Sequence, residues 1–93
     1  MSKTVFITGS SRGIGAATAK LFYNNGYNVV INYNNSEKEA LALQKELPGC
    51  LLLKGDVSKE KDVSEMIAKT VSHFGSIDVL VNNAGISVVN LLT

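Results

Sequence analysis

The sequence has few of the residues that build disulfide frameworks or metal sites. It contains one cysteine, Cys50, and one histidine, His73. A single cysteine excludes an internal disulfide and a cysteine-rich metal site, and its place before the apolar run 51–53 favours a small residue that faces the core. His73 has no partner at metal-ligand spacing, and we expect it in the last turn of a helix, where its charge suits the helix dipole. We therefore predict no metal site and assign neither residue a catalytic role.

An excess of charge of one sign and long hydrophobic runs are also missing. Nine basic and eight acidic residues leave a net charge of +1, which gives no general attraction to nucleic acid or to an anionic membrane surface. No uninterrupted apolar run approaches the roughly 20 residues of a membrane helix, and segment 1–4 leads into a strand pattern without an apolar signal segment. We expect no nucleic-acid or membrane partner and a cytoplasmic location, and any anion site has to be local.

What the sequence does contain is an alternation of short apolar runs and amphipathic segments. Its 93 residues are 45% hydrophobic and 18% charged, which is typical of one small globular domain. The apolar runs have the length and β-branched content of buried strands, and the segments between them have helical periodicity. The predicted strands are 4–8, 28–33, 50–54 and 77–82, and the predicted helices are 13–25, 36–47 and 58–74. The predicted order is therefore βαβαβαβ.

Several residues mark the ends of these predicted helices. Gly26 and Gly75 are typical of positions just after a helix. Ser36 with Glu39 three residues later predicts a capping box, and Ser58 is expected to be the N-cap of the third helix. The third helix also carries an apolar stripe at spacings of three and four residues, which we interpret as core.

Strands that alternate with helices predict parallel pairing through right-handed crossovers. The fold class is therefore α/β, with a Rossmann-like doubly wound parallel sheet whose four strands are ordered 3-2-1-4. A complete sheet of this kind would pair a fifth strand beside the fourth, so its outer edge is expected to be open. We interpret residues 1–93 as the N-terminal part of a single NAD(P)-binding Rossmann domain.

A glycine-rich turn follows the first predicted strand. Gly9, Gly13 and Gly15 lack Cβ atoms, so they can adopt positive φ, let backbone amides approach a phosphate and let the following helix pack close to the sheet. The positive end of the helix that begins near Gly13 favours an anion. A P-loop is disfavoured because Gly13 is followed by Ile14 rather than by the lysine of that motif. The turn is thus expected to hold the phosphates of a dinucleotide.

Three motifs in this sequence resemble those of the short-chain dehydrogenase/reductase family. They are Thr8-Gly9-x-x-x-Gly13-x-Gly15 after the first strand, Asp56-Val57 after the third, and Asn82-Asn83-Ala84-Gly85 after the fourth. The resemblance covers essentially the whole chain. Among the members of the family, 3-oxoacyl-(acyl carrier protein) reductases are the ones that segments 8–15 and 30–34 resemble most. The resemblance implies a nicotinamide dinucleotide as partner, with adenine contacts at Asp56-Val57. It also implies that the whole protein is a homo-oligomer that acts on a carbonyl substrate. If acyl carrier protein carries that substrate, the reaction belongs to fatty acid biosynthesis.

The predicted cofactor-binding residues lie on the turns that follow the four strands. They are Gly9, Ser10, Ser11, Arg12, Gly13, Ile14, Gly15, Tyr33, Asn34, Asp56, Val57, Asn83, Ala84 and Gly85.

NADP(H) is favoured over NAD(H) as the cofactor. An NAD site usually has Asp or Glu at the end of the second strand, which would repel a 2′-phosphate. This sequence has neutral residues at 32–35, and Arg12 can offer a guanidinium to that phosphate. Glu37 lies at nearly the right distance for an NAD site, but we expect it in the first turn of a helix, where it stabilises the dipole.

No catalytic residue is predicted in this chain. The resemblance implies a catalytic tyrosine followed four residues later by a lysine, so that both lie on one helical face. Tyr23, Tyr27 and Tyr33 are followed at that spacing by Tyr, Ile and Glu. We expect the chain alone to be inactive and to be the cofactor-binding portion of an NADPH-dependent carbonyl reductase. The alternatives are a non-catalytic NADP(H)-binding or interaction module, or an inert fragment.

Overall fold

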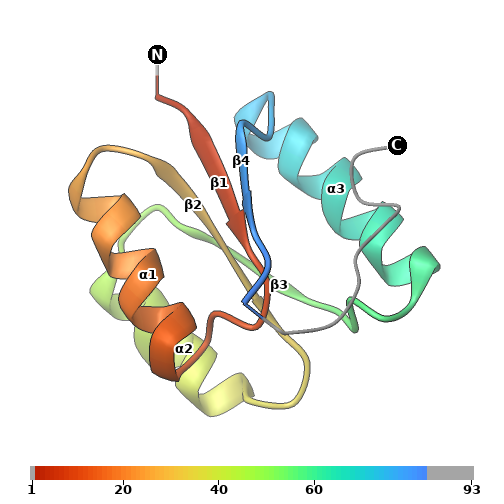
Figure 1. Ribbon diagram of the computed structural model, residues 1–93, viewed down its shortest axis with the longest axis horizontal. Coiled ribbons are helices and arrows are strands. Elements are labelled where there is room, and N and C mark those ends of the chain that lie inside the picture. Colours follow the sequence, from red (N-terminus) through yellow and green to blue (C-terminus); the bar gives the residue numbers. More distant parts are fainter. Residues whose placement is uncertain (1, 84–93) are drawn as a thin grey trace.

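The computed structural model describes residues 2–83, which form four strands and three helices in the predicted order. The strands are short and apolar, and the helices between them are amphipathic. The strands are β1 (Thr4–Ile7), β2 (Asn28–Tyr33), β3 (Leu51–Lys54) and β4 (Val79–Val81), and the helices are α1 (Gly13–Asn24), α2 (Glu37–Glu46) and α3 (Glu60–Phe74). Figure 1 shows this arrangement.

The four strands form one parallel sheet in the order β3-β2-β1-β4, which confirms the predicted topology. β1 occupies the centre, with Val5 beside Val29 of β2 on one side and Val79 of β4 on the other. The order reverses at β1, because β2 and β3 extend the sheet in one direction and β4 in the other. In open parallel sheets, ligands bind at the carboxyl ends of the strands beside such a reversal.

Helices cover both faces of the sheet, with α1 and α2 on one face and α3 on the other (Figure 1). Side chains alternate along each strand, so β1 sends Val5 and Ile7 to the α1 and α2 side and Phe6 to the α3 side. Each face builds its own apolar cluster, and all three of these side chains are fully buried. The central strands are therefore fixed on both faces, which gives the turns at their ends a rigid base.

Several element boundaries differ from the predictions. α3 begins at Glu60 with Lys59 as its N-cap, so the expectation that Ser58 caps this helix is wrong. The reason is that the Ser58 hydroxyl and amide both bond to the carboxylate of Asp56. Ser36 is the N-cap of α2, as predicted, but its side chain makes no capping hydrogen bond, so the capping box does not form.

β4 pairs only with β1 among the described residues, and its three residues are half-buried. Its outer edge therefore carries no strand within residues 2–83, in agreement with the expected open edge. No helix in this part of the chain combines the length and the apolar character needed to cross a bilayer.

Candidate functional site

The turn between β1 and α1 is built on two glycines with left-handed backbone conformation. Gly9 has a φ of 57° and Gly13 a φ of 62°, a region that residues with a Cβ atom rarely adopt. Gly13 is the first residue of α1. The chain therefore leaves the strand, turns sharply and enters the helix within five residues, as the sequence predicts.

Gly15 is required for a different reason, because other atoms occupy the space that a side chain would need. A Cβ atom built on it would lie 2.6 Å from Nδ2 of Asn83, 2.7 Å from the carbonyl oxygen of Gly9 and 2.8 Å from Cα of Ser10. Two of these three atoms belong to backbone, which cannot move aside cheaply. Gly15 thus lets the first turn of α1 pack directly on the glycine turn.

The end of β4 supports the glycine turn from one side. The Thr8 amide donates to the carbonyl of Val81 at 3.0 Å, and Nδ2 of Asn83 donates to the carbonyl of Gly9 at 3.0 Å. The Thr8 hydroxyl lies 3.3 Å from Oδ1 of Asn82. Asn83, 74 residues from Gly9 in sequence, therefore holds the backbone of the turn in place, and Asn82 contacts the side chain of Thr8.

The residues of the turn divide into a buried pair and an exposed pair. Ser10 and Ser11 are buried, and the Ser10 hydroxyl donates to the carbonyl of Ile7 at 2.8 Å. Arg12 and Ile14 are exposed, with Ile14 at 78%. The first amides of α1 have no acceptor within the helix, and no acidic residue lies in its first turn. The surface beside Arg12 is therefore suited to an anion.

The carboxyl end of β2 places Tyr33 and Asn34 on opposite sides of the sheet. The Tyr33 ring is buried, whereas Asn34 is exposed. Burial raises the pKa of Tyr33, and the nearby carboxylate of Glu37 raises this pKa further. Glu37 is the first residue of α2, as expected. The Glu37 carboxylate therefore lies near the Tyr33 hydroxyl.

The loop after β3 is held by its own acidic side chains. The Asp56 amide donates to Oδ2 of Asp62 at 2.9 Å, while Oδ1 of Asp56 accepts from the hydroxyl of Ser58 at 2.6 Å and from its amide at 2.9 Å. These bonds from Ser58 lower the pKa of Asp56, the hydroxyl contributing most. Asp56 is half-buried and Val57 is buried. The Asp56 carboxylate is therefore ionised and fixed in orientation.

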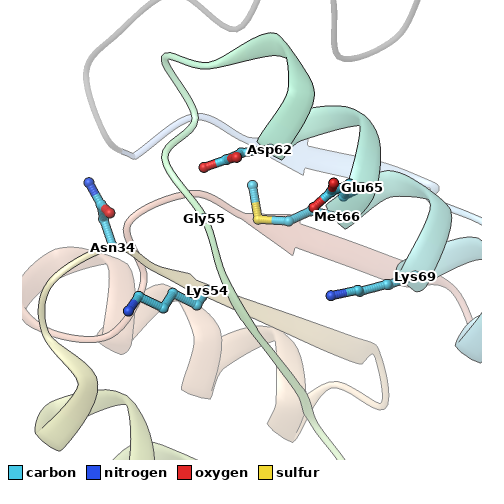
Figure 2. Close-up of a pocket in the computed structure, with 7 residues that line it drawn as sticks. All are labelled: Asn34, Lys54, Gly55, Asp62, Glu65, Met66 and Lys69. Carbon is cyan, nitrogen blue, oxygen red and sulfur yellow. The ribbon is translucent and has the colours of Figure 1, made fainter.

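A cavity of about 210 Å³ lies between the ends of β2 and β3 and the first turns of α3. Figure 2 shows Asn34 and Gly55 on one side of it, and Asp62 and Met66 from α3 on the other. Lys54, Glu65 and Lys69 complete its lining. The cavity places Asn34 beside the loop that carries Asp56-Val57.

The sequence does not predict two residues of the candidate site. Asn32 is expected only to be one of several neutral residues at the end of the second strand, yet its side chain contacts both Gly9 and Gly55. A signal exists in the sequence, because Asn32 follows Val30 by two residues on a strand face that is otherwise apolar. Asp62 lies within the predicted helix 58–74, and no sequence pattern indicates its bond to the Asp56 amide.

The structure thus brings most of the predicted site residues to one edge of the sheet. The turn 9–15, the end of β2, the loop at 55–57 and Asn83 all follow carboxyl ends of parallel strands. Ala84 and Gly85, which were also predicted, lie outside the described residues. The topology, the glycine turn and this edge define the class as a Rossmann-like α/β protein.

The comparisons with known proteins narrow this class to one family. The sequence profile described as short chain dehydrogenase matches residues 3–92. A 3-oxoacyl-[acyl-carrier-protein] reductase of Staphylococcus epidermidis is 45% identical, over 99% of this chain and 39% of its own length. L-fucose dehydrogenase of Mus musculus is 43% identical, over 89% of this chain and 30% of its own.

A solved structure agrees with this result. A dehydrogenase/reductase of Sinorhizobium meliloti matches with a TM-score of 0.85 and 37% identity, over 92% of this chain and 36% of that chain. The chain belongs to the short-chain dehydrogenase family. It spans about 39% of the length of the Staphylococcus epidermidis relative.

Proposed function

We propose that the protein binds NADP(H) at the carboxyl edge of its sheet and is the cofactor-binding part of a carbonyl reductase. The observation that carries this proposal is the glycine turn, in which Gly9 and Gly13 have positive φ and Arg12 is exposed at the start of α1. The free amides and the helix dipole there favour a pyrophosphate. When bound, NADPH supplies a hydride for reduction of a ketone.

The adenosine end of the cofactor is proposed to lie over β2 and β3. Asp56 and Val57 are suited to contact the adenine, because the Asp56 carboxylate is ionised and fixed. Tyr33 and Asn34 are proposed to face the adenosine ribose, with Asn83, Ala84 and Gly85 on the other side of the site. Ser10 and Ser11, both buried, are proposed to act through the shape of the turn.

A preference for NADP(H) follows from the charges around the proposed adenosine end of the site. The guanidinium of Arg12 is exposed and forms no salt bridge within residues 2–83, so it is available to a 2′-phosphate. Glu37 lies in the first turn of α2, and Asn34 at the end of β2 is neutral. NAD(H) is therefore proposed to bind more weakly.

The names of the relatives support the proposed reaction and substrate. Reduction of a 3-oxoacyl group carried by acyl carrier protein is proposed because relatives at 43–45% identity bear that name. Residues 1–93 are proposed to be the N-terminal part of one Rossmann domain, since the chain spans 39% of the length of the Staphylococcus epidermidis relative. The groups that protonate the product are proposed to lie on the rest of a longer protein. That longer protein is proposed to be a homo-oligomer, and this chain alone is proposed to be inactive.

Arg12→Ala tests the cofactor preference in the protein expressed from its complete reading frame. Dissociation constants for NADPH and NADH are measured by fluorescence titration. The variant is expected to bind NADPH about tenfold or more weakly, which corresponds to about 1.4 kcal/mol, while NADH changes much less.

Lys20→Ala is the matched control, since it removes a cation from the same helix. Lys20 pairs with Glu46 at 3.4 Å on the exposed surface, so the control is expected to bind both cofactors like the parent protein. Equal losses of NADPH and NADH affinity in Arg12→Ala would contradict the proposed preference.

A further inference from the structure

We propose that Asn32 is a positioning residue that fixes the spacing between the two loops of the proposed dinucleotide site. These are the phosphate turn, residues 8–13, and the adenine loop, residues 55–59. The inference rests on the proposed function, because it assigns Asn32 a role in that same site. Asn32 lies on β2, between the two loops, and touches both.

The side-chain amide of Asn32 divides its hydrogen bonds between the two loops. Oδ1 accepts from the amide of Gly9 at 2.9 Å, and Nδ2 donates to the carbonyl of Gly55 at 3.0 Å. Nδ2 also lies 3.3 Å from the sulfur of Met66 on α3. A primary amide has one acceptor oxygen and two donor hydrogens. The Asn32 side chain therefore uses its full donor capacity, and its two shortest bonds end on different loops.

The backbone of Asn32 adds further bonds to the phosphate turn. Its amide donates to the hydroxyl of Ser10 at 3.1 Å, and its carbonyl accepts from the amide of Ser10 at 2.9 Å. The Ser10 hydroxyl donates in turn to the carbonyl of Ile7. Because both residues are buried, these bonds exchange little with water. The phosphate turn is thus bonded to β2 as well as to β1.

A buried amide at this position needs an explanation. Asn32 is only 2% exposed and lies on the same strand face as Val30, where an apolar side chain would avoid the cost of removing an amide from water. Nothing in the pairing of β2 with its neighbours requires a polar side chain, since strands pair through backbone. The contacts that Asn32 gains are those to Gly9 and Gly55. The side-chain amide of Asn32 therefore bonds to the two loops and is not required for the pairing of the strands.

The spacing of the two loops matters for any ligand that bridges them. A dinucleotide is proposed to place its pyrophosphate on the phosphate turn and its adenine on the adenine loop, so it contacts both at once. A binding site gains affinity when its contacting groups are already held at the required distance. Loss of the link is therefore expected to weaken the bridging ligand even where the protein stays folded.

The experiment separates this positioning role from a general contribution to stability. Asn32→Leu removes both loop contacts in a similar volume, and Asn32→Ser is a smaller second variant in case the first does not fold. Thr70→Val is the matched control, because Thr70 is also fully buried and its hydroxyl bonds to Met66 within α3, away from both loops.

All variants are made in the protein expressed from its complete reading frame. The dissociation constant for NADPH is measured at a temperature well below each unfolding midpoint. Asn32→Leu and Asn32→Ser are expected to raise it at least about fivefold, the size expected from the loss of one hydrogen bond. Thr70→Val is expected to change it less than about twofold, although this substitution lowers the unfolding midpoint.

The possible outcomes separate this inference from the proposed function. If the parent protein binds NADPH and folded Asn32 variants bind it within about twofold as well, the positioning role is wrong and the proposed function stands. A loss of affinity in Thr70→Val equal to that in the Asn32 variants would also overturn the positioning role. If the parent protein binds neither NADPH nor NADH, the proposed function fails and the inference fails with it.

Discussion

The two ends of the sheet use similar polar contacts for different purposes. At the amino end, Oδ2 of Asp78 accepts from the Thr4 amide at 2.8 Å and from the Ser76 hydroxyl at 3.0 Å. At the carboxyl end, Asn32 and Asn83 bond to the backbone of Gly9. Both ends thus satisfy backbone groups with side chains. The difference lies in what the side chains connect.

The contacts at the amino end join a strand to its neighbouring segment. Asp78 ties the start of β1 to the segment before β4, and Nδ2 of Asn28 donates to the hydroxyl of Thr4 across β1 and β2. The contacts at the carboxyl end join loops to strands and leave Arg12 and Ile14, at the start of α1, exposed. We conclude that changes at the amino end should alter stability, whereas changes at the carboxyl end should alter binding as well.

The largest expected effect comes from a glycine substitution at the carboxyl end. Gly15→Ala gains about 1 kcal/mol of helix propensity, but its Cβ would overlap backbone atoms of Gly9 and Ser10, and such overpacking costs about 3 kcal/mol. We expect a net loss of about 2 kcal/mol in the free energy of unfolding, measured by urea titration, together with weaker NADPH binding.

Gly26→Ala is the matched control at the amino end. Gly26 has a φ of 85° with no atom near the position of a Cβ, so only backbone strain of about 1 kcal/mol is expected. Its NADPH affinity should equal that of the parent protein. A Gly15→Ala protein that is as stable as the parent and binds NADPH as tightly would contradict the distinction between the two ends of the sheet.

An intermediate effect is expected from Asp78 as the pH falls. The bond from the Thr4 amide, aided by the Ser76 hydroxyl, lowers the pKa of Asp78 in the folded protein. Its stabilising contribution is therefore complete above the unfolded pKa, near 4, and is lost as the pH falls through the folded pKa. Asp78→Asn should make unfolding stability less dependent on pH below about 5, as measured by urea titrations across this range.

NADPH binding by Asp78→Asn at neutral pH is expected to match that of the parent protein, because Asp78 lies at the end of the sheet away from the site. A loss of affinity without unfolding would show that the two ends are coupled, contrary to the comparison.

The smallest expected effect is a change in the pKa values of Asp56 and Asp78. The Ser58 hydroxyl donates to Asp56 at 2.6 Å and is the main cause of the lowered pKa of Asp56. The Ser76 hydroxyl donates to Asp78 over a longer distance, 3.0 Å, and is second to the Thr4 amide as a cause of the lowered pKa of Asp78. Ser58→Ala should therefore raise the pKa of Asp56 more than Ser76→Ala raises that of Asp78. Carboxyl NMR titration measures both shifts, and the reverse order would contradict the assigned causes.

Much of the fold and of the site could be predicted because they depend on local patterns. Alternating apolar runs indicate the strands, and a parallel sheet leaves few possible orders. Gly9 and Gly13 indicate the turn because their backbone conformation disfavours a side chain. The motif at Asn82-Asn83 indicates a third part of the site through resemblance, without the contact that the structure shows between Asn83 and Gly9.

The predictions that failed, and the residues that were missed, depend on contacts between distant or competing groups. Serine is a residue type that often caps helices, but the Ser58 hydroxyl bonds to the nearby carboxylate of Asp56 instead. Such local side-chain hydrogen bonds compete with capping. Asn32 acts through Gly9 and Gly55, each 23 residues away. No spacing rule within one strand reveals such a link, since it requires the register of β1, β2 and β3.

The most direct test of the account is a map of amide protection in the protein expressed from its complete reading frame, with and without NADPH. Hydrogen exchange should slow at residues 9–15 and 55–57, at the carboxyl ends of β1 and β3, and remain unchanged at residues 25–27 and 76–78, at the amino ends of β2 and β4. Protection at the amino end instead, or no protection at 9–15 under saturating NADPH, would contradict the assignment of the site.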